Sequence, residues 1–210
     1  MLLLIYRYLS NLFFIPILLF FFLRFLVSKE TISSVLEKFS ISRKKRPDGD
    51  LIWINGVSVG ESKTGIAVAR EIKKIKPESS ILFSTSTLSA YNLLSKSKNN
   101  FVVIFFPIDI NFLIKRFLKY WNPSSVIFIE SEIWPNIFNI LKEKSIKLSI
   151  LNARISNKSF INWKRINSFS KSVFPLIDQC YTQNNDSLKR FRELGTKNVK
   201  RIQNLKYISQ

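Results

Sequence analysis

From residue 51 onward, short apolar runs alternate with longer amphipathic stretches, and this alternation is the strongest constraint on the fold. The apolar runs are continuous, which is typical of strands buried on both faces of a parallel sheet. We predict strands at residues 51–54, 81–84, 102–106, 126–129, 148–151, 180–182 and 199–202. Between them we predict helices at residues 61–76, 88–95, 112–120, 135–144, 159–174 and 186–194. Strands and helices in this order predict an α/β fold with a doubly wound, Rossmann-like parallel sheet.

A second feature is the almost wholly apolar stretch at residues 2–27. A membrane-spanning helix needs about 20 apolar residues, and the cleanest run here, residues 12–23, is shorter. Arg7 and Arg24 lie near its ends, where long cationic side chains can reach lipid headgroups. No helical stripe is visible, which disfavours a one-sided surface helix, and no small-x-small site is present, which disfavours a cleaved signal peptide. We predict an uncleaved membrane-anchor helix at residues 1–28, with a buried core helix as the alternative.

The segment that follows is polar and basic. Residues 29–50 end in a turn signal, so we predict a basic linker with a short helix at residues 32–39. A cationic cluster at residues 43–46 follows the apolar stretch, whereas Arg7 and the amino group precede it. The positive-inside rule then places the remainder, a folded domain at residues 51–210, at the cytoplasmic face.

The charge balance limits the partners and the chemistry of the chain. Lys and Arg number 33 against 14 Asp and Glu, a formal net charge of +19, which favours anionic partners such as an acidic membrane surface or a phosphorylated substrate. Nucleic acid is disfavoured, because no aromatic-basic recognition motif accompanies the charge. The chain has no histidine, which excludes Ser-His-Asp triads, imidazole bases and His-ligated zinc. Its one cysteine, Cys180, lies in an apolar stretch and is predicted to be a buried thiol.

A tight glycine turn, residues 55–61 (NGVSVGE), joins the first strand of the domain to its first helix. The turn lacks glycines that a P-loop or a dinucleotide-binding fingerprint requires. Ser58 and Glu61 fit a capping box, in which Glu61 bonds back to the amide of Ser58. Glu61 also lies at a strand end, where parallel sheets usually bind their ligands. A structural cap and a catalytic base both remain open for Glu61.

Other charged residues follow predicted strands and therefore lie at the same sheet edge: Glu130, Glu132, Arg154 and Lys206. If the backbone stays extended, Glu130 and Glu132 face the same way. A second carboxylate beside Glu61 would help the site to hold a proton, and Arg154 suits a phosphate or a sugar acid. The alternative is a set of solvated loop acids beside a solvated basic helix face.

Taken together, these segments resemble the Kdo transferases, a family of glycosyltransferases. The resemblance rests on the apolar N-terminal stretch and on four motifs in the order of the family: SVGE at 58–61, ESEIWPN at 130–136, NARIS at 152–156 and NLKY at 204–207. It implies a GT-B fold and transfer of 3-deoxy-D-manno-octulosonic acid (Kdo) from CMP-Kdo to a lipid A precursor. It also implies a location at the cytoplasmic face of the inner membrane and a reaction without a metal ion or other cofactor.

The resemblance also assigns roles to residues. The general base falls on Glu61, which would take the proton from the acceptor hydroxyl that attacks the anomeric carbon of Kdo. Stabilisation of the transition state falls on Glu130 and Lys206. The predicted substrate-binding residues are Ser58, Gly60 and Arg154.

Two departures from the family pattern affect these expectations. The family commonly has a histidine where this chain has Asn55, so any role of that imidazole is absent or taken over. A GT-B enzyme has two Rossmann-like halves, and the CMP-Kdo contacts of the family lie mostly in the second. We expect residues 51–210 to be the N-terminal, acceptor-binding half, with the C-terminal, donor-binding half absent. The alternative is a non-enzymatic, membrane-anchored binding module or an inactive fragment.

Overall fold

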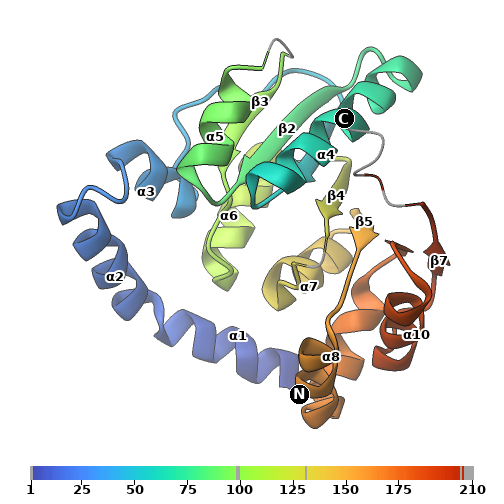
Figure 1. Ribbon diagram of the computed structural model, residues 1–210. Helices are drawn as coiled ribbons and strands as arrows, with labels where there is room; N and C mark the ends of the chain where they lie inside the picture. Colours follow the sequence, from blue (N-terminus) through green and yellow to red (C-terminus); the bar gives the residue numbers. More distant parts are fainter. Residues whose placement is uncertain (1, 98–99, 131, 204, 206–210) are drawn as a thin grey trace.

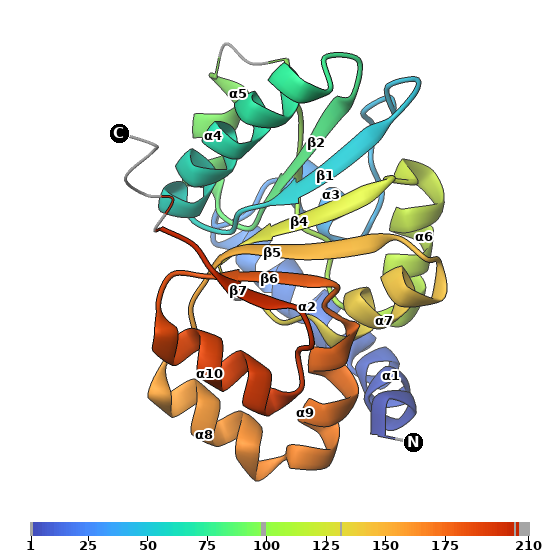
Figure 2. The same ribbon diagram turned by 90° about the vertical axis from the view of Figure 1, so that its right-hand side faces the viewer.

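The computed structural model describes residues 2–97, 100–130, 132–203 and 205, and it confirms the parallel α/β prediction. Within these residues, seven strands form one parallel sheet in the order β3-β2-β1-β4-β5-β6-β7. The strands are β1 (Leu51–Asn55), β2 (Ser80–Thr85), β3 (Val102–Phe105), β4 (Ser125–Ile129), β5 (Lys147–Ala153), β6 (Gln179–Thr182) and β7 (Val199–Arg201). Their carboxyl ends meet at one edge of the sheet, on the left in Figure 2. The order changes direction between β1 and β4, and ligands of open α/β sheets bind beyond the strand ends at such a point.

The described helices cover the sheet, and the first two form an N-terminal arm that runs along one side of the domain (Figure 1). They are α1 (Leu2–Leu12), α2 (Phe14–Leu26), α3 (Ile32–Lys38), α4 (Val59–Ile75), α5 (Leu88–Ser95), α6 (Asn111–Trp121), α7 (Pro135–Glu143), α8 (Asn157–Arg165), α9 (Asn167–Val173) and α10 (Asn185–Leu194), with a short 3-10 helix η1 (Phe174–Leu176).

Both faces of the sheet are apolar because the strand residues alternate between two clusters. Ile52 and Ile54 of β1 pack with α4 and α5, whereas Leu51 and Trp53 pack with the larger cluster that includes α6 and α7. Cys180 of β6 belongs to the larger cluster, and burial raises the pKa of its thiol to about 12. The prediction of a buried thiol is confirmed.

The predicted helix at residues 159–174 is broken into α8, α9 and η1. Ile166 leaves the helical conformation, with φ −105° and ψ 45°. The hydroxyl of Ser170 donates to the carbonyl of Trp163 (2.5 Å). In a continuous helix this carbonyl would instead accept a hydrogen bond from a backbone amide. The other predicted strands and helices of the domain are confirmed to within a few residues at their ends.

The apolar N-terminal stretch forms two helices rather than one. Helices α1 and α2 meet at an angle of 47°. Pro16 lies in the first turn of α2. In one continuous helix its ring would clash with the backbone carbonyl of Leu12, four residues earlier, so the chain bends here. Among the described residues, neither helix alone has the length and apolarity to cross a membrane, and the bent pair reaches them only when both helices are counted. The anchor role of this segment therefore stays a prediction.

One face of α1 and α2 packs against the domain. A row of half-buried residues recurs three or four positions apart, at Leu3, Arg7, Ser10, Phe14, Ile17, Phe21 and Arg24, and the other half-buried residues, Leu2, Tyr6 and Asn11, lie next to members of this row. The expectation against one-sided packing is wrong, because apolar residues on every side of the helices hide the stripe that makes contact. Arg7 pairs with Glu143 (2.6 Å) and Arg24 with Glu30 (3.3 Å), so both cations that we expected to reach headgroups bind carboxylates of the protein.

The segment at residues 29–50 also packs on the domain. It contains α3, the predicted short helix, and its buried Lys38 pairs with Glu30 at 2.5 Å. The carboxylate of Glu37 accepts a hydrogen bond from the amide of Phe105 at the end of β3 (2.8 Å). These contacts fix the end of α2 against the sheet.

Asp109 joins the N-terminal helices to the start of α7. Its carboxylate accepts hydrogen bonds from the amides of Asn136 (3.1 Å) and Ile137 (2.8 Å) and from the hydroxyl of Tyr6 in α1 (3.2 Å). The side chain amide of Asn136 in turn donates to Ser10 of α1 (2.9 Å). Burial raises the pKa of Asp109 from 3.8 to about 6, and these hydrogen bonds act in the opposite direction.

The raised pKa of Asp109 makes the stability of the chain depend on pH. Between pH 4 and 6 the folded state binds a proton at Asp109 that the unfolded state does not, so the free energy of unfolding falls as pH rises. We expect the contribution of Asp109 to fall by about 3 kcal/mol across this range. Urea unfolding of the wild type and of Asp109→Asn at pH 4 and pH 7 measures this contribution as a change in their difference. An equal difference at both pH values would contradict the prediction.

Candidate active site

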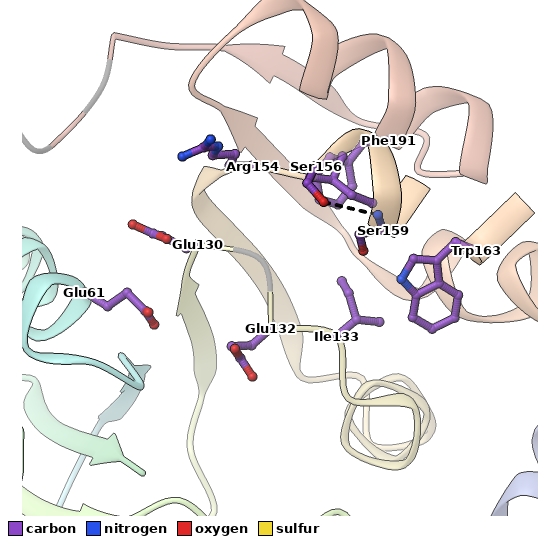
Figure 3. Close-up of a pocket in the computed structure, with 10 residues that line it drawn as sticks. Glu61, Glu130, Glu132, Ile133, Arg154, Ser156, Ser159, Trp163 and Phe191 are labelled. Atoms are coloured by element: carbon purple, nitrogen blue, oxygen red, sulfur yellow. Dashed lines mark hydrogen bonds between the residues drawn. The ribbon is translucent and has the colours of Figure 1, made fainter. Parts of the chain in front are cut away.

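A pocket of about 310 Å³ lies at the carboxyl edge of the sheet. Its lining residues are Glu61, Glu130, Glu132, Ile133, Arg154, Ile155, Ser156, Ser159, Trp163 and Phe191. Figure 3 shows the three carboxylates and Arg154 toward one end, and the serines and aromatic rings toward the other. All three carboxylates singled out from the sequence therefore line one pocket, together with Arg154.

The glycine turn holds Glu61 by its carboxylate. Ser58 is the N-cap of α4, and its hydroxyl oxygen accepts from the amide of Glu61 (3.3 Å). The carboxylate accepts from the hydroxyl of Ser58 (2.9 Å) and from the amide of Val57 (2.8 Å). The predicted bond to the amide of Ser58 is thus replaced by one to the preceding residue. Glu61 caps the helix and still lines the pocket, so the two functions are compatible.

Close backbone approach explains the first glycine of the turn. A Cβ atom at Gly56 would lie 3.1 Å from the backbone of Glu61 and Ser62. At Gly60 a Cβ atom would meet only the hydroxyl of Ser58, at 3.9 Å, so the space beside this residue is open. Ser58 and Gly60 are exposed beside Glu61 but do not line the pocket, and their role in substrate binding stays a prediction.

A polar chain inside the sheet lies beneath the turn. The indole of Trp53 donates to Ser84 (2.7 Å), whose hydroxyl donates to the side chain carbonyl of Asn55 (2.8 Å). Asn55, which stands where the family commonly has histidine, is fully buried at the end of β1. Its side chain NH₂ has no hydrogen-bond partner among the described residues. Asn55 therefore lies in the layer that supports the turn and does not line the pocket.

The loop after β4 does not continue as an extended strand. Glu130 has a φ of +66°, a left-handed conformation that is uncommon outside glycine. The premise that made Glu130 and Glu132 face the same way is therefore wrong. Such strained residues cluster at functional sites.

Glu132 is the carboxylate in this pocket whose protonation the surroundings favour. Burial raises its pKa, the negative charge of Glu61 raises it further, the indole of Trp134 lowers it, and Glu130 adds a smaller increase. The family resemblance assigned a role to Glu130 and none to Glu132, which lies three residues beyond the end of β4. The like-charge interaction expected at this edge is present, and it acts on Glu132.

Arg154 brings a cation to the same pocket. It follows β5 and is exposed to solvent. Before it, the buried Asn152 has a φ of +59°, and its side chain carbonyl accepts from the amide of Leu205 (3.2 Å). Lys206, the other predicted catalytic cation, lies outside the described residues.

The aromatic end of the pocket was not predicted. Ser156 is the N-cap of α8 and accepts from the amide of Ser159 (3.1 Å), and Trp163 follows one turn later. The helical spacing of Ser156, Ser159 and Trp163 was present in the sequence, but such spacing more often marks a core face. Among the described residues, no group of three acidic, histidine or cysteine side chains is placed to hold a metal ion.

The family model and three curated relatives that match this chain carry the same family description. The model for "3-Deoxy-D-manno-octulosonic-acid transferase (kdotransferase)" matches residues 33–209. The 3-deoxy-D-manno-octulosonic acid transferase of Rickettsia bellii is 35% identical over 190 residues, 90% of this chain and 45% of that protein. The corresponding figures are 35% over 161 residues (76% and 34%) for the enzyme of Rickettsia conorii and 30% over 145 residues (69% and 34%) for that of Haemophilus influenzae. The chain spans less than half of the length of these relatives.

Proposed function

The chain belongs to the 3-deoxy-D-manno-octulosonic-acid (Kdo) transferase family, and from this premise we propose that it is the acceptor-binding half of a Kdo transferase. The reaction is the transfer of Kdo from CMP-Kdo to a lipid A precursor in lipopolysaccharide biosynthesis. The observation that carries the proposal is the convergence of Glu61, Glu132 and Arg154 on one pocket at the switch point of the sheet. The donor would be bound mainly by the other half of the enzyme.

In the proposed reaction Glu61 is the general base. A hydroxyl oxygen of the acceptor attacks the anomeric carbon of Kdo, the bond from that carbon to the phosphate oxygen of CMP breaks, and CMP leaves with the electron pair. The proton of the hydroxyl passes to Glu61. Two hydrogen bonds, from Val57 and Ser58, hold the carboxylate in place, and its remaining lone pairs are available to accept that proton.

The other pocket residues would adapt the site to anionic substrates. The raised pKa of Glu132 favours a proton on this carboxyl, and such a proton would lower the negative charge that CMP-Kdo and a phosphorylated acceptor meet. The guanidinium of Arg154 can form paired hydrogen bonds with a phosphate or with the carboxylate of Kdo. Glu130 and Lys206 are proposed to stabilise the transition state, as the family resemblance implies.

The proposed location is the cytoplasmic face of the inner membrane. The outer faces of α1 and α2 expose large apolar residues, among them Leu12 (74%), Leu19 (57%), Phe22 (54%) and Leu26 (61%). Contiguous apolar surface of this kind is typical of a membrane-contacting region. The net charge of +19 suits an anionic lipid surface.

The function is tested by an assay of the chain completed with the remaining sequence of the Rickettsia bellii relative, with CMP-Kdo and a lipid A precursor as substrates. Kdo-dependent growth in the mass of the acceptor supports the proposal. Binding of the acceptor without transfer would favour the non-enzymatic binding module instead.

In this assay we expect Arg154→Ala to raise the KM for an anionic substrate by roughly 10- to 100-fold, the effect of losing hydrogen bonds to a charged group. Arg154→Lys keeps the charge but not the forked geometry, so its KM should lie between the values for the wild type and for Arg154→Ala. Lys158→Ala removes a nearby exposed cation that does not line the pocket and serves as the control. An equal loss in Arg154→Ala and Lys158→Ala would show a general charge effect and contradict a specific role of Arg154.

A further inference from the structure

A second, mostly apolar groove of about 390 Å³ lies between α2 and the loops at the carboxyl edge of the sheet. We propose that this groove binds one acyl chain of the lipid acceptor whose sugar occupies the carboxylate pocket. The proposal rests on the proposed function and adds to it a binding site for the lipid part of the substrate. The residues that carry the argument are Ile17 and Phe21 of α2, Phe106 and Ile108 of the loop after β3, and Trp134.

Trp134 connects the groove to the proposed catalytic site. It follows Glu132 by two residues and directly precedes α7. Its ring lies 5.2 Å from that of Phe106 inside the groove, while Glu132 and Ile133, which directly precede it, line the neighbouring pocket. A polar pocket and an apolar groove are therefore separated by one short loop. This arrangement matches a ligand in which a sugar and an acyl chain are covalently joined.

The outer wall of the groove supports an acyl chain as the occupant. Phe20 of α2 lines the groove and is 55% exposed, and the neighbouring outer residues of α2 are apolar as well. An apolar groove exposed to water is unfavourable, and burial of methylene groups in it would be favourable. A chain that leaves a bilayer beside α2 would enter the groove along the apolar side chains of Ile17, Phe20 and Phe21.

The rim of the groove adds a cation. The side chain of Arg24 is 38% exposed at the groove and pairs with the buried Glu30. Acylated sugars of the proposed acceptor class carry phosphates, and a cation at the rim is complementary to such a group. Shape, apolarity and rim charge thus favour an acylated sugar phosphate.

The experiment compares the fluorescence of the whole chain after removal of Trp134 or of Trp163, one at a time. Trp53 and Trp121 are buried in the core, so Trp134 reports on the groove and Trp163 on the carboxylate pocket. The probe is a diacylated glucosamine phosphate with brominated acyl chains, since bromine quenches tryptophan on contact. We expect the probe to quench emission in Trp163→Phe, which keeps Trp134, and to lose most of this quenching in Trp134→Phe. Quenching of Trp163 in place of Trp134 would overturn the proposal.

A matched pair of variants tests whether the groove itself is occupied. Ser86 lines the groove, whereas Ser89 is exposed on α5 and does not. We expect Ser86→Phe to weaken binding of the probe about tenfold by filling the groove, and Ser89→Phe to leave it unchanged. Unchanged binding in both variants would contradict the proposal.

Two further measurements separate the sources of the acyl chain and the two proposals. Vesicles of brominated phosphatidylglycerol without the probe should quench Trp134 weakly, and quenching as strong as with the probe would assign the groove to membrane lipid and overturn the proposal. Kdo transfer to the same probe tests the function independently. Transfer without quenching of Trp134 would refute the acyl site while the proposed function stands. Quenching of Trp134 without transfer would refute the proposed function and support the binding of an acyl chain in the groove.

Discussion

Replacing Glu61 with glutamine is expected to reduce Kdo transfer by about 10²- to 10⁴-fold, the usual contribution of a general base. Glutamine has nearly the same shape as glutamate and can still accept one hydrogen bond from Val57 or Ser58 at the turn. It cannot take up the proton of the acceptor hydroxyl. The loss should therefore appear in kcat, with little change in the KM of either substrate. Initial rates of the completed enzyme measure it.

Two controls make this result specific to Glu61. Ser58→Ala removes the N-cap and the hydroxyl that orients Glu61 but keeps the base, so we expect a smaller loss of rate and a destabilisation of about 1 kcal/mol. Glu132→Gln removes the neighbouring carboxyl of the same pocket. Near-normal turnover in Glu61→Gln together with a large loss in Glu132→Gln would transfer the role of base to Glu132.

The largest expected effect on stability comes from Trp53→Ala, which should lower the free energy of unfolding by about 3–5 kcal/mol. Trp53 is completely buried at the centre of the larger core cluster. Its ring lies 4.8 Å from that of Phe117 and 5.8 Å from that of Phe128, and its indole is bonded to Ser84. Alanine would leave a cavity and remove the donor to Ser84, and both changes are costly in a core.

Urea unfolding monitored by circular dichroism measures this effect. Ile161→Ala, at a residue 42% exposed on α8, provides a matched truncation at the surface and should cost less than about 1 kcal/mol. A cost for Trp53→Ala no larger than that of Ile161→Ala would contradict the role of Trp53 in the core. Ser84 also donates a hydrogen bond to Asn55 beneath the Glu61 turn. The fraction of the Trp53→Ala variant that still folds should therefore bind the acceptor less tightly than the wild type does.

The sheet was predictable because each strand is marked locally. Runs such as residues 51–54 and 126–129 are apolar on both faces, and a parallel sheet is the structure that buries both faces. The edge at which Glu61, Glu130 and Arg154 meet followed from the same logic, since parallel strands end on one side. These inferences needed no knowledge of contacts between distant residues.

Features that depend on tertiary contacts were not predictable. The left-handed conformation of Glu130 changes the direction of the loop that follows it. In the folded pocket, burial and the neighbouring carboxylates raise the pKa of Glu132, a residue to which the family resemblance assigned no role. The break of the predicted helix at Ile166 is accompanied by a bond from the hydroxyl of Ser170 to the carbonyl of Trp163, and the apolar pattern shows neither. The packing of α1 and α2 left no trace in the pattern because their exposed residues are themselves strongly apolar, so no apolar stripe marks the face that makes contact.

The bonds between α1 and the start of α7 have a consequence for how the proposed enzyme would meet its acceptor. Tyr6 and Ser10 are joined to Asp109 and Asn136, and Arg7 is joined to Glu143. A domain on a flexible tether would tumble above a bilayer and face the acceptor only part of the time. Here the tilt and the height of the pocket above the lipid surface would be set when the chain folds. The orientational entropy of each encounter would then already be lost, and the search would become lateral diffusion in two dimensions.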